Sequence, residues 1–126
     1  MTDQELHIEI TELEGGEEGA IALVKVDGRI TVMESERFAH KIEVISSIKP
    51  AVAILDCEKL EFITSAGIGE LIKLSRMLEG NKASMMLANV NEDVSKLFEQ
   101  SKLDAMMPIY TDVEAAMTQA KMRAGA

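Results

Sequence analysis

The predicted fold follows from one stretch of the chain, Asp56-Cys-Glu-Lys-Leu-Glu-Phe-Ile-Thr-Ser-Ala-Gly-Ile-Gly69. The apolar run over 51–55 leads into it and predicts a strand covered on both faces, followed by a short polar loop. The loop delivers Thr64 and Ser65 to the start of an apolar-striped helix. A hydroxyl there lies where free backbone N–H groups and the helix dipole favour negative charge. The stretch therefore predicts that a phosphate on Ser65 would be tolerated.

Hydrophobic periodicity predicts the elements before this stretch. Apolar and polar residues alternate over 6–11, which indicates a half-exposed strand. Residues 14–19 form a turn cluster, and 20–26 then predict a second strand antiparallel to the first. Apolar residues recur at helical spacing over 33–48, so this segment is predicted to be an amphipathic helix.

The same reasoning predicts alternating elements after the stretch. The helix that follows Ser65 should end at Gly80, and 83–88 predict the next strand. Asn91 is the predicted N-cap of a third helix. A short strand over 106–110 comes next, and Thr111 begins a predicted capping box for the last helix.

Strands that alternate with helices of this length predict an α/β fold with crossover connections. We expect a mixed, mainly parallel sheet of about five strands with about four α-helices packed on it. The first hairpin supplies the antiparallel pair. At 126 residues the chain is predicted to be a single domain over 1–126.

Composition narrows the classes of partner. The formal net charge of −9 argues against nucleic acid and anionic membrane surfaces, since both require clustered Lys and Arg. No apolar run approaches the roughly 20 residues that a membrane span needs. Residues 1–5 are acidic, without the basic and apolar regions of a signal peptide. These features predict a cytoplasmic protein without membrane insertion.

No catalytic or metal-binding constellation is evident in the sequence. His7 and His40 fall on a strand's polar face and on a helix, and surface histidine is the better interpretation of both. Cys57 is the only cysteine, which excludes an internal disulfide. Gly67-Ile-Gly69 does not complete a dinucleotide fingerprint. We therefore predict no cofactor and no metal.

The glycines and Ser65 each have a purely structural interpretation. Two glycines in the first helical turn cost that helix about 1 kcal/mol each relative to alanine. They could permit close helix–strand packing, or keep the surface around Ser65 low for a partner, and the two roles are compatible. Ser65 could be a simple N-cap, worth ~1 kcal/mol.

The stretch resembles the signature of STAS domains, and specifically of bacterial anti-sigma factor antagonists. In that family an apolar strand ends in Asp, and an apolar pair, a polar residue, a phosphorylatable Ser, a small residue and Gly-apolar-Gly follow. Residues 54–56 and 62–69 occupy those places here. Residues 26–30 and 94–98 are similar to two further family segments, so the resemblance spans most of the chain.

The resemblance implies a non-enzymatic partner switch. In this family the unphosphorylated domain binds an anti-sigma factor that is also a serine protein kinase, and phosphorylation ends the binding. By resemblance Ser65 is the acceptor. The implied partner-binding residues surround it: Gly28, Thr31, Thr64, Ala66, Gly67 and Ile68. We expect the free protein to be a monomer.

Two positions depart from the family pattern and leave alternatives open. Thr64 stands where Asp is common, so it is an alternative phosphate acceptor, and Thr31 replaces a common acidic residue. STAS domains also occur as accessory subunits of membrane transport complexes or sensory scaffolds, which is the alternative function. An enzyme is the third option, and the lack of a catalytic constellation argues against it.

Overall fold

The computed structural model describes residues 6–13 and 19–124 of the chain. The strands of this part are β1 (His7–Leu13), β2 (Ile21–Ile30), β3 (Val52–Ile63), β4 (Ser84–Ala88) and β5 (Ile109–Tyr110). The α-helices are α1 (Ser35–Ile48), α2 (Ser65–Gly80), α3 (Glu92–Gln100) and α4 (Val113–Ala124). Two short 3-10 helices, η2 (Val32–Glu34) and η3 (Leu103–Ala105), precede α1 and β5.

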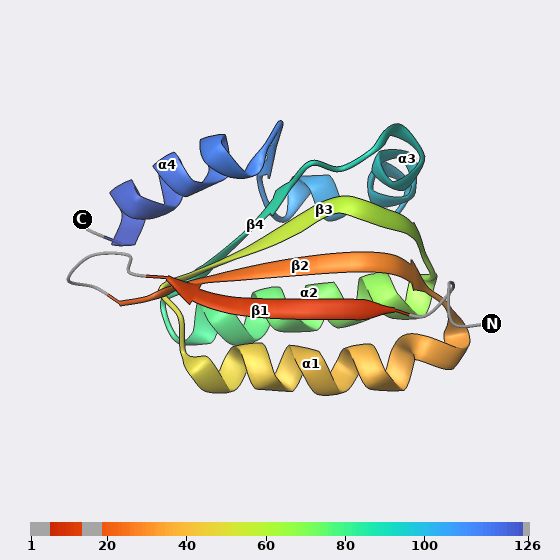
Figure 1. Ribbon diagram of the computed structural model, residues 1–126, viewed down its shortest axis with the longest axis horizontal. Coiled ribbons are helices and arrows are strands. Elements are labelled where there is room, and N and C mark those ends of the chain that lie inside the picture. Colours follow the sequence, from red (N-terminus) through yellow and green to blue (C-terminus); the bar gives the residue numbers. More distant parts are fainter. Residues whose placement is uncertain (1–5, 14–18, 125–126) are drawn as a thin grey trace.

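The strands form one sheet in the order β1-β2-β3-β4-β5. β1 is antiparallel to β2, and each of the other neighbouring pairs is parallel. Helices α1 and α2 cover one face of the sheet, while α3 and α4 lie on the other (Figure 1). The prediction of a mixed, mainly parallel α/β sheet with helices packed on it is confirmed.

Two apolar clusters hold these layers together. The larger contains the predicted inner face of α1, where Phe38, Ile42 and Ile45 are each at most 1% exposed. The smaller lies under α4, whose buried Ala116 and Ala120 face the sheet. Burying these apolar surfaces on both faces of the sheet is the main force that stabilises the fold.

The strand before Ser65 is longer than predicted. We expected a strand over 51–55 and a polar loop, but β3 runs without interruption from Val52 to Ile63. The polar residues remain in the sheet because β2 extends to Ile30 and pairs with them through two register shifts. Such irregularities bend a strand and re-aim its side chains, so polar residues can stay at the surface. Asp56 therefore does not end the strand.

Three predicted boundaries also shift. The helix predicted over 33–48 is α1 from Ser35, with η2 ahead of it. The strand predicted over 106–110 is reduced to β5, because the chain first turns through η3. The cap of α4 is Asp112, whose Oδ1 accepts the N–H of Ala115 at 2.7 Å. Asp112 rather than Thr111 therefore satisfies the helix end.

Other predicted features are confirmed or lie outside the described residues. Asn91 caps α3, since its Oδ1 accepts the N–H of Val94 at 2.8 Å. Helix α2 ends at Gly80 as predicted. Most of the turn cluster over 14–19, and all of the acidic segment over 1–5, fall outside the described part. No helix in the described part is long and apolar enough to cross a bilayer.

Candidate functional site

The start of α2 separates two hydroxyls that are adjacent in the sequence. Thr64 is the N-cap, with extended backbone angles, and its side chain accepts the N–H of Gly67 at 3.2 Å. Ser65 is the first helical residue, so the alternative in which Ser65 is the cap is corrected. The reason lies in the sheet: the N–H of Thr64 donates to the carbonyl of Ile30 at 3.0 Å, which keeps Thr64 extended at the end of β3.

The side chain of Ser65 is exposed rather than enclosed by the core. Its hydroxyl forms no hydrogen bond with other described residues, whereas the neighbouring Thr64 hydroxyl is engaged. The free N–H groups at the start of α2 give the surroundings a positive partial charge. The site can therefore present a hydroxyl to another molecule, and its surroundings are chemically suited to negative charge.

Ser65 borders a shallow groove of about 590 Å³. The groove is formed where the end of β3, the start of α2, η2 and the end of α3 meet. Its lining is mainly apolar, with a few polar side chains: Val32, Phe62, Ile63, Thr64, Ser65, Ala66, Ile68, Leu97, Gln100 and Ser101. The arrangement suits the docking of a protein surface, since few charged groups must be desolvated.

The aromatic wall of this groove is held by a cation. The guanidinium of Arg29 on β2 lies 5.0 Å from the ring centroid of Phe62 on β3. A contact of this kind orients both side chains and contributes roughly 0.5–1 kcal/mol at a partly exposed site. This contact favours the orientation in which the ring lines the groove.

Three of the six predicted partner-binding residues line the groove. They are Thr64, Ala66 and Ile68. Gly28 and Gly67 are buried and offer no side chain to a partner. A Cβ on Gly67 would lie 2.7 Å from Ile63 Cγ1, so this glycine lets α2 pack closely on the sheet.

Gly28 and Thr31 lie on the strand and turn that lead to the groove. Gly28 adopts a φ of +115°, a conformation available to glycine, beside a register shift of β2. Thr31 is half-buried and precedes Val32, a groove residue. Neither Gly28 nor Thr31 is among the residues that line the groove.

Sequence reasoning missed two features of this surface. Val32 and Met33 of η2 are 74% and 91% exposed, although both are apolar. Leu97, Gln100 and Ser101 of α3 join the groove from a distant part of the sequence. The exposure of Met33 could not be read from its place at the start of a predicted amphipathic helix, and Val32 lies just before that helix, where no pattern was assigned. Nothing in the local sequence of α3 indicates contact with Ser65.

The remaining chemically reactive residues lie away from this groove. Cys57 is buried, and burial, with a smaller contribution from the Asp56 carboxylate, raises the pKa of its thiol to about 12. His7 and His40 are exposed on β1 and α1. No group of three or more His, Cys, Asp or Glu in the described segments is placed to hold a metal ion.

Fold and site together define an α/β domain in which a helix start presents a serine beside an apolar groove. The family model that matches the chain describes the STAS domain, and it covers residues 13–116. Because this match spans most of the sequence, the chain belongs to the STAS domain family, as its resemblance implied.

Individual relatives extend this comparison. The chain is 24% identical over 100 residues to an anti-sigma F factor antagonist of Paenibacillus polymyxa, covering 79% of this chain and 86% of that protein. The structure of the anti-sigma factor antagonist SpoIIAA in its unphosphorylated form matches with a TM-score of 0.70 and 23% identity. That match covers 87% of this chain and 93% of SpoIIAA.

A transporter also contains this fold. Murine Slc26a9, an anion transporter of the Solute Carrier 26 family, matches with a TM-score of 0.76 and 16% identity. The match covers 96% of this chain but 23% of the transporter. At such identity the likeness shows that the two share a fold.

Proposed function

We propose that this protein is an anti-sigma factor antagonist that acts as a partner switch through Ser65. Unphosphorylated, it binds an anti-sigma factor that is also a serine protein kinase, and so releases the sigma factor. Transfer of phosphate to Ser65 ends that binding. The protein itself performs no catalysis in this scheme.

The observation that carries the proposal is the exposed Ser65 hydroxyl at the edge of the apolar groove. A kinase can reach this hydroxyl, and a partner seated in the groove would cover it. The geometry also favours Ser65 over Thr64 as the acceptor. The Thr64 oxygen accepts the N–H of Gly67, so its use would remove the cap of α2.

A phosphate on Ser65 would act on the free energy of partner binding rather than on the stability of the fold. A phosphate adds roughly 1.5 to 2 negative charges and three strong acceptors. A neutral Ser65 can be covered by a partner at small cost, whereas a phosphoserine would be desolvated without a matched cation, at several kcal/mol. Moving a complex from mostly bound to mostly free needs about 5.5 kcal/mol of differential affinity. One buried phosphate can supply most of that difference.

The relatives support the same role. The matching Paenibacillus polymyxa protein is an anti-sigma F factor antagonist. SpoIIAA is an anti-sigma factor antagonist for which both an unphosphorylated and a phosphorylated form have been solved. These names support an anti-sigma factor as the partner that we propose for the groove. The serine kinase activity of that partner is a further part of the proposal, taken from the family resemblance of the segment around Ser65.

The experiment combines phosphorylation with binding. Incubation with ATP and the anti-sigma factor kinase should add one phosphate, seen by intact mass, and Ser65→Ala should abolish it. In calorimetry Ser65→Asp should bind the kinase more weakly than Ser65→Ala. Ser47→Asp on α1 is the charge control: Ser47 is exposed, lies outside the groove, and should leave the affinity unchanged. Equal affinities of Ser65→Asp and Ser65→Ala would reject the switch.

The alternative is an accessory STAS subunit of a membrane transport or sensory complex, without a phosphate switch. The fold that this chain shares, over 96% of its length, with part of the transporter Slc26a9 motivates this alternative. Under this alternative the kinase adds no phosphate, and Ser65→Asp leaves partner binding unaltered. The mass measurement therefore separates the two functions.

A further inference from the structure

Strand β1 is an edge of the sheet. Its seven residues, His7–Leu13, pair with β2 on one side, and no other strand of the described segments pairs with the opposite side. In the view of Figure 1, β1 is drawn in front of the sheet. An edge of this length presents unpaired backbone N–H and C=O groups that can accept a further strand.

The two faces of β1 differ in character. Ile8 and Ile10 are half-buried against the core on the α1 side of the sheet. Residues alternate between faces along a strand, so the exposed Glu12 shares the face of these isoleucines. His7 and Glu9 are exposed on the opposite face. The α1 side of the edge therefore carries two partly covered isoleucines and one carboxylate.

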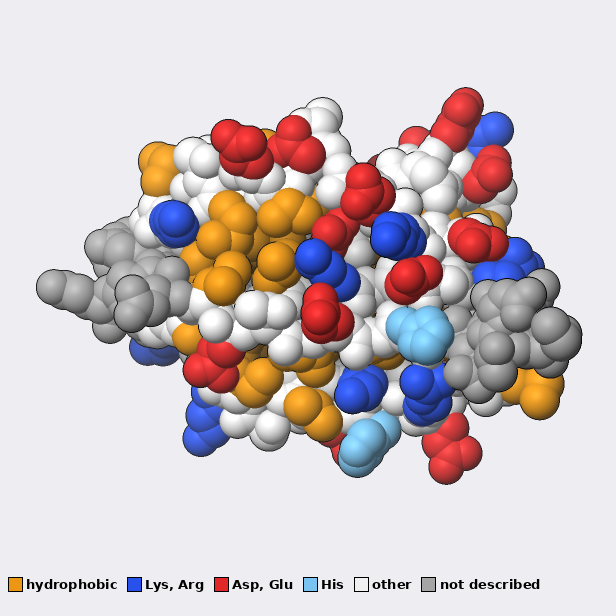
Figure 2. All heavy atoms as spheres, in the orientation of Figure 1, with side chains coloured by type: hydrophobic (Ala, Val, Ile, Leu, Met, Phe, Trp, Pro, Cys, Tyr) orange, Lys and Arg blue, Asp and Glu red, His pale blue; other side chains and the backbone are white. Residues whose placement is uncertain are grey.

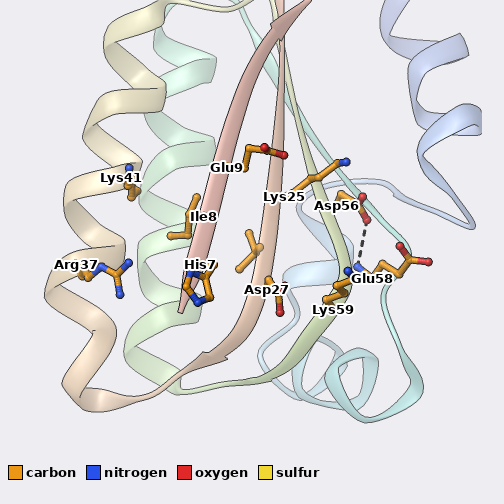
Figure 3. A pocket seen from close by; sticks show the side chains of 11 residues that line it. His7, Ile8, Glu9, Lys25, Asp27, Arg37, Lys41, Asp56, Glu58 and Lys59 are labelled. Atoms are coloured by element: carbon orange, nitrogen blue, oxygen red, sulfur yellow. Dashed lines mark hydrogen bonds between the residues drawn. The ribbon is translucent and has the colours of Figure 1, made fainter. Parts of the chain in front are cut away.

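Cations lie beside this edge. A hollow of about 550 Å³ surrounds the start of β1, and Arg37 and Lys41 of α1 line it on the side toward which Ile8 points (Figure 3). Arg37 already contacts Glu34 at 3.3 Å, whereas Lys41 forms no ion pair with the described residues. Charges of both signs gather across the middle of this surface (Figure 2).

In place of the monomer expected from the sequence, we infer that a second copy of this chain adds to the edge, with the two β1 strands antiparallel about Ile10. This register pairs all seven residues of each strand and keeps like faces together. It places Ile10 opposite Ile10 of the partner subunit, so two half-exposed apolar side chains cover each other. It also places Glu12 of the partner subunit opposite Ile8, on the face where Arg37 and Lys41 lie.

Charge complementarity favours a second copy over an arbitrary strand. Each edge carries both the carboxylate, Glu12, and the cation, Lys41, that the other needs. A two-fold axis repeats the pair, as self-complementary dimers require. The opposite edge of the sheet, β5, has two residues and cannot form the same ladder.

The test is the oligomeric state and its response to charge. Sedimentation equilibrium over a wide concentration range should show a monomer–dimer equilibrium. Glu12→Lys faces Lys41 of the partner subunit twice per dimer, and should raise the dissociation constant roughly tenfold. Lys41→Glu should do the same, and the double variant should restore the dimer. Glu99→Lys, an exposed change on α3, is the control and should leave the constant unchanged.

Three results would overturn the inference. They are a monomer at every concentration, a dimer insensitive to both single charge changes, and a double variant that fails to recover. Circular dichroism of each variant verifies that it is folded; because Glu12 is exposed, its substitution leaves the core intact. Ser65→Ala should dimerise like the wild type, so the outcome is independent of the proposed switch.

Discussion

The hydroxyl oxygen of Thr64 accepts the N–H of Gly67 at 3.2 Å, which leaves the hydroxyl of Ser65 exposed and without a capping role. Thr64 therefore caps α2, while the neighbouring Ser65 presents its hydroxyl at the surface. A modification of Ser65 need not disturb the bond that starts α2, because that bond belongs to Thr64. The division gives a direct way to separate stability from partner binding.

Thr64→Val should destabilise the protein, whereas Ser65→Ala should not. Losing a cap oxygen costs about 1 kcal/mol of unfolding free energy, within a range of roughly 0.5–2. Truncating an exposed serine without a partner should change it by less than about 0.5 kcal/mol. Urea denaturation followed by circular dichroism measures both. A loss in Ser65→Ala as large as that in Thr64→Val would contradict the assignment of the cap.

The two glycines near the start of α2, Gly67 and Gly69, should respond in opposite directions to alanine. A Cβ on Gly67 would lie 2.7 Å from Ile63 Cγ1 and 2.9 Å from Ile30 Cγ2, so Gly67→Ala should cost about 1–3 kcal/mol through overpacking. A Cβ on Gly69 meets nothing within 4 Å. Gly69→Ala should therefore stabilise α2, by up to about 1 kcal/mol.

Thermal or urea unfolding of this matched pair provides the measurement. If Gly67→Ala were as stable as Gly69→Ala, the helix would not depend on close approach to the sheet. The result also decides between the two roles weighed for the glycines, since a glycine retained only for partner access would accept alanine without loss of stability.

Met33→Ser should weaken binding of the anti-sigma factor kinase by about tenfold or more. The side chain is 91% exposed next to the groove, and covering an apolar side chain of this size contributes roughly 1.5–3 kcal/mol. Calorimetry with unphosphorylated protein measures the change. Met122→Ser is the matched control, because this methionine is 63% exposed on α4 and lies outside the groove. Equal effects of the two substitutions would place the docking surface elsewhere.

The stability contributed by neutral Cys57 should be lost as pH rises above 9. The thiol has a pKa raised from 9.0 to about 12 in the folded protein, so the unfolded chain releases its proton first. The unfolded state then binds fewer protons, and unfolding free energy falls by up to about 1.4 kcal/mol per pH unit between these values. Below about pH 9, the pKa of the thiol in the unfolded chain, the thiol is protonated in both states and Cys57 makes its full contribution to stability.

Urea denaturation of wild type and Cys57→Ala across this alkaline range tests the effect. The difference between the two pH profiles isolates the thiol from other groups that titrate there. Parallel profiles would show that the thiol does not remain protonated in the fold. A thiol reagent at neutral pH should likewise react after unfolding and not before, because the side chain is fully buried.

Apolar periodicity predicted the order of strands and helices, because burial of one face imposes a repeat of 2 or 3.6 residues on the sequence. Apolar periodicity was least informative where pairing within the sheet overrides the secondary structure that the local sequence favours. The polar residues after Asp56 indicate a loop, yet pairing with β2 keeps them in β3. Thr64 and Ser65 are both acceptable caps, and only the bond from Thr64 N–H to Ile30 selects between them.

The groove is a second feature that sequence patterns could not predict. Leu97 lies more than thirty residues beyond Ser65 in the chain, and no local pattern links the two. They meet because α3 follows β4, which pairs in parallel with β3 on the side of the sheet away from β1. Contacts across crossover connections depend on sheet order, which helical and strand periodicities do not contain.

The sequence by itself determined the α/β class, the inner faces of the helices and the presence of a hydroxyl pair at the start of α2, because these depend on local spacing and residue type. Only the tertiary structure decided which hydroxyl caps and which is presented, that Val32 and Met33 are uncovered, and that α3 completes the groove. Each of these depends on which distant segments the sheet brings together, and that is a property of the assembled layers.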